Sequence, residues 1–186
     1  YGFYLENSDN NNFTGNIAND NQYGLWSEGS DNNRFVNNTA NSNERGFHFA
    51  ITSGDSHNDN NYFRNNTAVN NTGFSYTLES MLATNANKVL CTDDFDTSNI
   101  GGADGKPFLY ESNLDNYELL NADNYSGIIL CNVSNGYLEN ITIDNSLNDM
   151  TSDGIAMVIS DNVVLNRSRI IGAGLGINLE QTDNSL

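Results

Sequence analysis

Short runs in which apolar and polar residues alternate recur along the chain, and each of them follows a glycine. In the run after Gly46, Phe47 and Phe49 flank His48. Alternation over four to six residues is typical of a strand with one buried face. We therefore predict a strand after each of the glycines at positions 2, 24, 46, 127, 154 and 176. The outer face of these strands is expected to carry Trp26, His48 and Asn178.

A second series of strands is predicted farther along each run. Its apolar centres are Phe13, Phe35, Phe63, Leu138 and Leu165, with Leu90 expected to take this place in a coil beginning at Gly73. Clusters of Asn, Asp, Ser and Gly separate the predicted strands. These residue types form turns, so each run has a strand, a turn and a second strand.

The pattern repeats with a fixed period, which the even spacing of Gly2, Gly24 and Gly46 sets. The unit GFYLENSDNNNFTGNIANDNQY, from Gly2, aligns with GLWSEGSDNNRFVNNTANSNER, from Gly24. A fixed period of this size marks a repeat architecture, and the leucine-rich pattern of similar length is absent. A unit of two or three short strands without a helix fits one coil of a solenoid. We predict an all-β, right-handed, single-stranded parallel β-helix, a pectate-lyase-like solenoid of about eight coils.

Asparagine is unusually abundant, with 36 residues in a chain of 186. Coils of a parallel β-helix stack about 4.8 Å apart, so asparagines one unit apart would bond to each other as internal ladders. Two ladders are predicted, Asn16–Asn38–Asn66 and Asn21–Asn43–Asn71. We expect Asn38 to be buried, and its replacement by leucine to cost about 1–3 kcal/mol because backbone groups at the bend lose partners.

The repeat pattern divides the chain into regular coils over 1–91, an interrupting excursion over 92–126 and resumed coils over 127–186. The excursion is inferred from Gly101-Gly102, an Asp-Gly turn and the only proline. Longer loops near 50–59 and 77–86 are candidate binding loops, because binding often resides in loops on one side of a solenoid. The chain opens and stops in mid-pattern. We expect a piece of a longer polypeptide, with neighbouring repeats or identical chains end to end as partners.

Charge and composition limit the classes of molecule that this chain is expected to bind. The formal net charge is −17, from 24 acidic and 7 basic residues. This disfavours nucleic acids and anionic membranes, which need Lys/Arg patches. No apolar run approaches the roughly 20 residues of a membrane span, so no membrane insertion is expected in this segment. Cys91 and Cys131 could pair, although their spacing does not demand it.

The units GFYLENSDNNNFTGN and GLWSEGSDNNRFVNNTAN resemble the NosD-type right-handed β-helix repeats, also called periplasmic copper-binding or CASH-type repeats. The segment DTSNIGGADGKPFLY, followed by GIILCNVSNGYLENITIDN, is similar to an interruption in large surface proteins of methanogenic archaea. The resemblance covers nearly the whole chain. It implies a β-helix in a family that spans a copper-enzyme maturation factor, carbohydrate-active relatives and surface proteins, and no catalytic pattern carries over.

Repeated aspartates are the candidate calcium sites. Asp9 and Asp31 lie one unit apart, and Asp59, Asp161 and Asp183 occupy similar turns. A second candidate is the cluster Asp93, Asp94 and Asp96, which with Ser98 begins like a Ca²⁺ loop. The later positions depart from that loop, because Asn99 replaces its glycine and Gly105 its bidentate glutamate. The alternative for the repeated aspartates is a solvated acidic turn. For the second cluster it is a polar loop flanking a strand, with Phe95 as its buried anchor.

The sequence gives less support for a copper site or a catalytic site. Soft ligands other than cysteine are limited to His48, His57, Met81, Met150 and Met157, without a clustered motif, and Met157 fits the core. Polysaccharide-cleaving enzymes of this fold need clustered carboxylates or Ca²⁺ with a basic residue. The candidates, Asp93 and Asp94 with Arg167 and Arg169, belong to different coils.

Three functions follow as hypotheses. The first is a non-catalytic structural or adhesive module of an extracellular, cell-surface protein, of surface-layer, sheath or adhesin type. The second is a domain that binds or cleaves carbohydrate, which an aromatic-and-carboxylate groove would favour. The third is periplasmic copper handling, which rests on the family resemblance. Fold alone does not decide between them.

Overall fold

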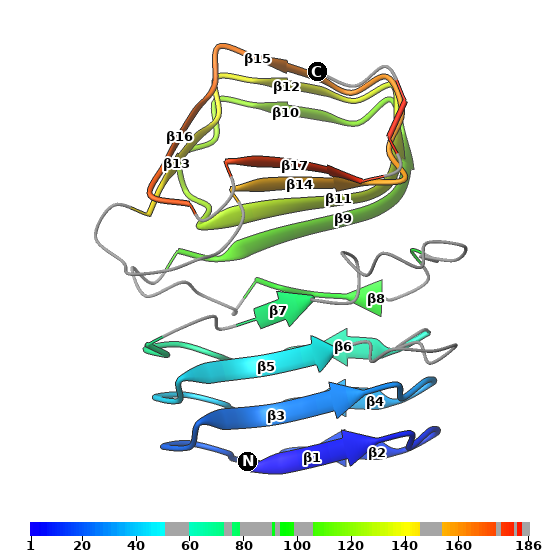
Figure 1. The fold of residues 1–186 in the computed structure, drawn as a ribbon, viewed down its shortest axis with the longest axis vertical. Coiled ribbons are helices and arrows are strands. Elements are labelled where there is room, and N and C mark those ends of the chain that lie inside the picture. The colour runs from blue at the N-terminus through cyan, green and yellow to red at the C-terminus, as the bar shows by residue number, and fades with distance from the viewer. Residues whose placement is uncertain are drawn as a thin grey trace. The chain divides into compact units, whose positions relative to one another are not determined.

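The structure is a computed structural model, and it consists of parallel strands joined by tight bends. It describes residues 1–50, 60–72, 76–78, 91, 94–98, 106–145, 154–173, 176–180 and 182–183. Every regular element among these residues is a strand. All the strand pairs given for them are parallel, and each pairs one coil with the next (Figure 1). The prediction of a parallel β-helix is confirmed.

The chain divides into two compact units, Tyr1–Gly105 and Lys106–Leu186. In the first unit, one sheet has the order β1-β3-β5-β7 and a second has the order β2-β4-β6-β8. The strands of the first sheet are β1 (Phe3–Glu6), β3 (Tyr23–Glu28), β5 (Arg45–Ala50) and β7 (Tyr76–Leu78). Those of the second are β2 (Asn12–Thr14), β4 (Arg34–Val36), β6 (Tyr62–Arg64) and β8 (Asp94–Phe95). Isolated bridges Ile17–Thr39–Thr67 form a third side of the coil.

The register of the first unit follows the sequence repeat. Phe3 pairs with Leu25 and Phe13 with Phe35, both at the predicted step of one unit. The next step in the second sheet is longer, because Phe35 pairs with Phe63. The chain therefore keeps its alignment despite the longer arm in the third coil, whose residues 51–59 are not described.

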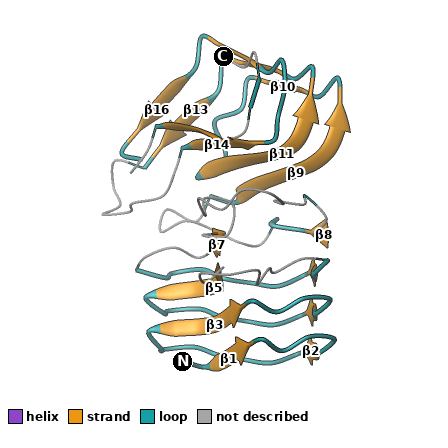
Figure 2. Cartoon of the chain, turned by 45° about the vertical axis from the view of Figure 1, so that its right-hand side comes forward, coloured by secondary structure: helices purple, strands orange, loops and turns teal. Residues whose placement is uncertain are grey.

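In the second unit the coil has three sides (Figure 2). The sheet orders are β17-β14-β11-β9, β10-β12-β15 and β13-β16. The first sheet contains β9 (Phe108–Asp115), β11 (Gly127–Ser134), β14 (Ile155–Val158) and β17 (Ile177–Glu180). The other strands are β10 (Glu118–Leu120), β12 (Tyr137–Glu139), β15 (Val164–Asn166), β13 (Thr142–Asp144) and β16 (Arg169–Ile171).

The predicted excursion over 92–126 is wrong for much of its length. Its beginning already belongs to a coil, because Phe95 in β8 pairs with Phe63. Its end is a complete coil, because Phe108 pairs with Gly127 and Glu118 with Tyr137. This coil escaped the sequence pattern because it opens with a phenylalanine in place of glycine and is shorter than the regular unit.

The expected fourth coil is also shifted. Phe95 takes the place beside Phe63 that was predicted for Leu90, which lies outside the described residues. In the first sheet Phe47 pairs with Tyr76, two residues later than a coil starting at Gly73 would place it. The prediction failed because it carried the spacing of the third coil unchanged into the fourth.

At Gly24, a glycine opens the coil because no side chain fits there. A Cβ atom on Gly24 would lie 2.6 Å from the Cβ of Ala40 and 2.7 Å from the carbonyl oxygen of Gly46. Real Cβ atoms do not approach backbone that closely, so the neighbouring coil excludes any larger residue. A glycine is therefore required at this position because the turn of the same coil and the backbone of the next coil pack closely against it.

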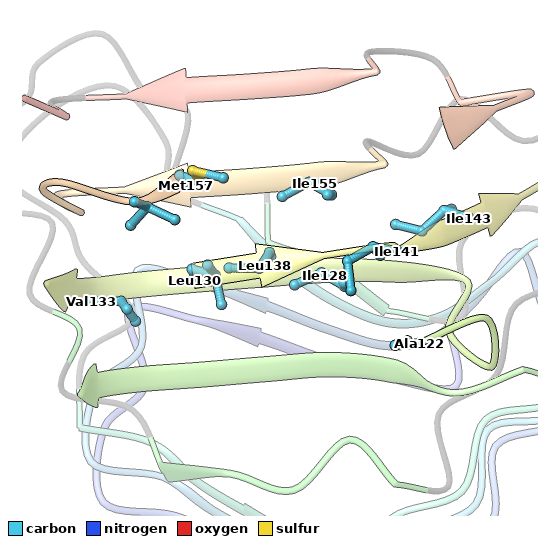
Figure 3. Close-up of a cluster of buried hydrophobic side chains, with 10 residues drawn as sticks. Ala122, Ile128, Leu130, Val133, Leu138, Ile141, Ile143, Ile155 and Met157 are labelled. Carbon is cyan, nitrogen blue, oxygen red and sulfur yellow. The ribbon is translucent and has the colours of Figure 1, made fainter. Parts of the chain in front are cut away.

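The two units have different cores. Phenylalanines fill the first, where Phe13 stacks on Phe35 with ring centroids 5.4 Å apart and Phe63 meets Phe47 edge-on at 4.9 Å. Aliphatic side chains fill the second (Figure 3). They come from β11, β12, β13, β14 and the adjoining bends: Ala122, Ile128, Leu130, Val133, Leu138, Ile141, Ile143, Ile155, Met157 and Val163. In each core, the side chains of one coil pack on those of the adjacent coils, as in other solenoids.

One carboxylate occupies a core column of the second unit. Glu111 pairs with Leu130, whose other neighbour, Met157, is also buried. Burial raises the pKa of Glu111. Burial, followed by the charges of Glu111 and Tyr125, also raises the pKa of the nearby Tyr117. The neutral form of Glu111 is therefore the one that suits its position.

This position gives a pH-dependent prediction. The stability provided by neutral Glu111 is fully present below the ordinary carboxyl pKa and is lost as pH rises through the raised pKa. Glu111→Gln stays neutral, so we expect it to raise the melting temperature at about pH 7 and to change it little at about pH 4. Thermal melts followed by circular dichroism test this, with the exposed Glu118→Gln as control. An equal effect at both pH values would contradict it.

Candidate functional site

The bends between strands are built by residues in the left-handed conformation. In the first unit these fall into columns, for example Asn10–Asn32–Asn60 with φ between 56° and 59°. Asparagine tolerates this conformation better than other non-glycine residues, because its short side chain can bond locally. In each case the next residue is an asparagine, and the side chains of Asn33 and Asn61 accept a backbone N–H from the neighbouring coil. The Asn-Asn pairs of the sequence therefore combine a bend former with a ladder residue.

The first ladder contains Asn16, Asn38 and Asn66. The Oδ1 atom of Asn38 accepts the backbone N–H and the side-chain N–H of Asn16, both at 3.0 Å. Its Nδ2 donates to the carbonyl oxygen of Phe13 at 2.9 Å and to Oδ1 of Asn66 at 3.0 Å. Asn38 is 3% exposed. One amide thus links three successive coils.

The second ladder contains Asn21, Asn43 and Asn71. The backbone N–H of Asn21 donates to Oδ1 of Asn43, and the N–H of Asn43 donates to Oδ1 of Asn71, both at 2.8 Å. Asn43 also donates from Nδ2 to the carbonyl oxygen of Ala18 at 2.9 Å. These bonds satisfy backbone groups that the bend removes from the strands.

A third ladder was missed by the sequence analysis. Asn11 N–H donates to Oδ1 of Asn33 at 2.8 Å, and Asn33 N–H donates to Oδ1 of Asn61 at 2.9 Å. Beside it, Ser8 N–H donates to Oγ of Ser30 at 3.0 Å. The signal was available, because the Ser-Asp-Asn-Asn motif recurs one unit later. By residue type alone, this motif predicts a turn and not a ladder.

The second unit uses serine for similar bonds. The N–H of Val133 donates to Oγ of Ser160, and the N–H of Ile141 donates to Oγ of Ser168, both at 3.1 Å. Asn145 donates from Nδ2 to the carbonyl oxygen of Ser126 at 2.9 Å. Inter-coil side-chain bonds therefore occur in both units, although the residue type differs.

The aspartates of the repeated turn act in the same way. The backbone N–H of Asp31 donates to Oδ1 of Asp9 at 2.8 Å. In the second unit the N–H of Asp183 donates to Oδ1 of Asp161 at 3.0 Å. Each carboxylate thus bonds the turn of the next coil, which is the behaviour of a structural turn residue. Asp59 lies outside the described residues.

Only part of the acidic cluster Asp93, Asp94 and Asp96 lies among the described residues. Asp93 is not described, and Asp94 is described as backbone of β8. The N–H of Ser98 donates to Oδ1 of Asp96 at 3.0 Å. Burial raises the pKa of Asp96, but the Ser98 bonds and the charge of Arg64 outweigh it, so the pKa falls below its ordinary value. Among the described residues, no three His, Cys, Asp or Glu side chains group as a metal site.

Copper ligands do not assemble in the described parts of the chain either. His48 is buried, with Nδ1 3.4 Å from Nη1 of Arg45. Met157 lies in the core of the second unit. Neither cysteine is a free thiol, since Cys91 and Cys131 are both disulfide-bonded and so offer no thiolate. His57, Met81 and Met150 lie outside the described residues. The side chains that are described do not fit a copper site.

The candidate basic residues of an enzymatic site lie on the surface. Arg167, whose side chain is 79% exposed, is 3.5 Å from Glu139. Arg169 begins β16 and is also exposed. The predicted binding loops near 50–59 and 77–86 lie mostly outside the described residues.

The structure brings together a group of aromatic rings that the sequence analysis did not identify as a site. They lie on the outer side of β1, β3 and β5, and we call them the aromatic face. Trp26 is the centre, with ring centroids 4.6 Å from Tyr23, 5.4 Å from Tyr1 and 6.3 Å from Tyr4. The buried ring of His48 closes one side of the face, 4.4 Å from Trp26.

Charged groups border the aromatic face. Glu6 and Glu28 pair one above the other at the end of the same strands. The hydroxyl of Tyr4 donates to Oε2 of Glu28 at 3.3 Å. Desolvation and then the carboxylates of Glu28 and Glu6 raise the pKa of Tyr4 to about 12. On the other side, the guanidinium of Arg45 lies 5.5 Å from the ring centroid of Tyr23.

Alternation predicts that Trp26 and His48 lie on the outer face, and the step of one unit aligns Tyr4 with Trp26. Together, the two patterns place these outward residues in columns on one face of the sheet. No helix in the described ranges has the length and hydropathy of a membrane span.

Comparison with known proteins gives one match. Residues 1–89 match the family model NosD, described as "Periplasmic copper-binding protein (NosD)". No curated protein and no solved structure matches the chain. The matched residues are the coils in which the strict repeat and the asparagine ladders are clearest. Over residues 1–89, the chain is similar to the NosD-type β-helix repeat proteins.

Proposed function

We propose that this chain is a non-catalytic structural module of an exported protein at the cell surface. The observation that carries the proposal is the use of the inner polar side chains. In Asn38, for example, both the oxygen and the nitrogen of the side-chain amide form hydrogen bonds with neighbouring coils. Side chains committed to holding coils together are not available for acid–base chemistry or for ligands.

Two further observations support an exported location. Both cysteines are disulfide-bonded, and disulfides persist in oxidising compartments outside the cytosol. The matching family is described as periplasmic. An acidic, asparagine-rich surface is also well hydrated, which suits a module exposed to solvent at the surface.

We do not extend the copper-binding description of the family to this chain. The described histidine and methionine, His48 and Met157, are each enclosed by other groups, and the cysteines are oxidised. Calcium binding by the aspartate turns also lacks a cluster among the residues with defined positions.

Surface exposure and catalysis can be tested separately. Antibodies raised against this segment should label intact cells, and external protease should remove the signal. Purified protein incubated with pectins, alginates and common glycans should release neither reducing ends nor unsaturated products. Labelling only after cell lysis would contradict the location. Turnover that is lost on replacing Asp93 or Asp94 would contradict the non-catalytic assignment.

A further inference from the structure

The aromatic face has no role in the interior of the solenoid. The inner side of the same strands supplies the core, through residues such as Leu5, Leu25 and Phe47. Tyr4, by contrast, is 47% exposed, and Trp26 and Tyr23 are only partly buried. Large rings clustered at a surface cost solvation free energy, and such a patch commonly marks an interaction site.

The charges around the face select the kind of partner. Glu6 and Glu28 line one border, and the net charge is −17, so a polyanion would be repelled. Arg45 already lies over Tyr23 on the opposite border, which disfavours a strongly cationic partner at that ring. A neutral partner avoids both penalties.

The chemistry of the face fits a neutral polyol. The faces of aromatic rings pack against apolar C–H groups, while tyrosine hydroxyls and carboxylates exchange hydrogen bonds with hydroxyl groups. A pyranose ring offers both, with C–H bonds on its faces and hydroxyls at its edge. Tyr4 and Trp26 belong to successive coils in register, and their ring planes are inclined at 70° to each other, so the two rings offer a sugar chain an angled surface.

We propose that the aromatic face binds a neutral glycan chain. Sugar rings pack on Tyr4 and Trp26, and sugar hydroxyls donate to Glu6 and Glu28. The proposal rests on the exported location argued above, since glycans are abundant at cell surfaces. It places binding on the outer face of β1, β3 and β5.

The chain contains one tryptophan, Trp26, so its fluorescence reports on this face alone. Purified protein titrated with cello-, laminari-, manno- and chito-oligosaccharides should show a saturable change in tryptophan emission with at least one of them. Tyr4→Ala keeps the fluorophore and should weaken that binding by about tenfold, equivalent to about 1.4 kcal/mol. Trp26→Ala should abolish retention of the protein in a native gel containing the corresponding polysaccharide.

Tyr62 provides the matched control. It is 37% exposed and lies on β6, in the other sheet of the same unit, beside Arg34 and Arg64. Tyr62→Ala removes an exposed ring of the same kind and should leave the affinity unchanged. Melting curves of all three variants show whether each is folded, and Trp26→Phe replaces Trp26→Ala in the gel if the alanine variant is unfolded.

Several results would overturn the proposal. One is the absence of any emission change with all four neutral series at millimolar sugar. Others are binding of only a polylysine or a polyuronate, or equal weakening by Tyr4→Ala and Tyr62→Ala. If Tyr4→Ala lowers only the melting temperature and the wild-type protein binds no glycan, the rings merely stabilise the sheet. This assay is independent of location and turnover, so its failure is distinct from failure of the surface-labelling test.

Discussion

Replacing Phe63 with alanine is expected to lower the free energy of unfolding by about 3–5 kcal/mol, the usual cost of truncating a buried phenylalanine. Phe63 is fully buried and lies among four other rings. Its centroid is 4.9 Å from that of Phe47, 5.6 Å from Phe95, 6.0 Å from Phe49 and 6.3 Å from Phe35. Removing the ring leaves a cavity between these packed side chains, and the cost depends on how far they can move to fill it.

Urea titration of the wild-type and variant proteins measures this loss. Tyr62→Ala is the control in the same strand, because Tyr62 faces outward and should cost less than about 1 kcal/mol. If Phe63→Ala proves too unstable to purify, Phe63→Leu keeps most of the volume and should cost about 1–2 kcal/mol. A change below about 1 kcal/mol for Phe63→Ala would show that this ring stack is not the core of the unit.

The sequence predicted the fold best where the repeat is strict. Between Phe13 and Phe35 the step, the strand type and the parallel pairing all follow from one alignment. This works because each coil packs mainly on its neighbours, so a residue and its equivalent one unit later occupy the same environment. Burial of residues such as Phe35 follows from the same argument.

The prediction failed where a coil differs in length from the regular unit but keeps the same strand pairing and bend conformation. Phe108 replaces the opening glycine, and its coil is shorter than the regular unit, yet Asn116 and Asn135 share the left-handed bend conformation with φ of 57° and 51°. A bend requires a residue that tolerates positive φ, whereas arm length is free to vary. The Asn positions were therefore better markers of the coil than the glycine.

The candidate site could be predicted only in part. Pairwise alignment puts Tyr4 over Trp26, but it does not show that Tyr23 and Arg45 lie beside them or that His48 is enclosed. Those facts depend on which outward side chains lean toward one another across the sheet. The aspartate turns show the converse, because a suggestive stack of carboxylates, such as Asp9 below Asp31, serves the backbone of the next coil.

Replacing Asn38 with leucine is expected to lower the free energy of unfolding by about 1–3 kcal/mol. The leucine is similar in size, so the loss comes from hydrogen bonds and not from a cavity. Without the Asn38 amide, the N–H of Asn16 and the carbonyl oxygen of Phe13 lose their side-chain partner at the bend. Leaving a buried polar group unsatisfied costs about 1–3 kcal/mol, which a leucine side chain does not restore.

Urea titration gives the magnitude, and hydrogen exchange locates the cause. The backbone N–H of Asn16 should exchange faster in Asn38→Leu than in the wild-type protein under native conditions, because its acceptor is gone. Asn12→Leu makes the same chemical change at an exposed position of the neighbouring strand β2 and should alter stability by less than about 0.5 kcal/mol. Equal losses for the two variants, or unchanged protection of Asn16, would mean that the ladder does not hold the coils together.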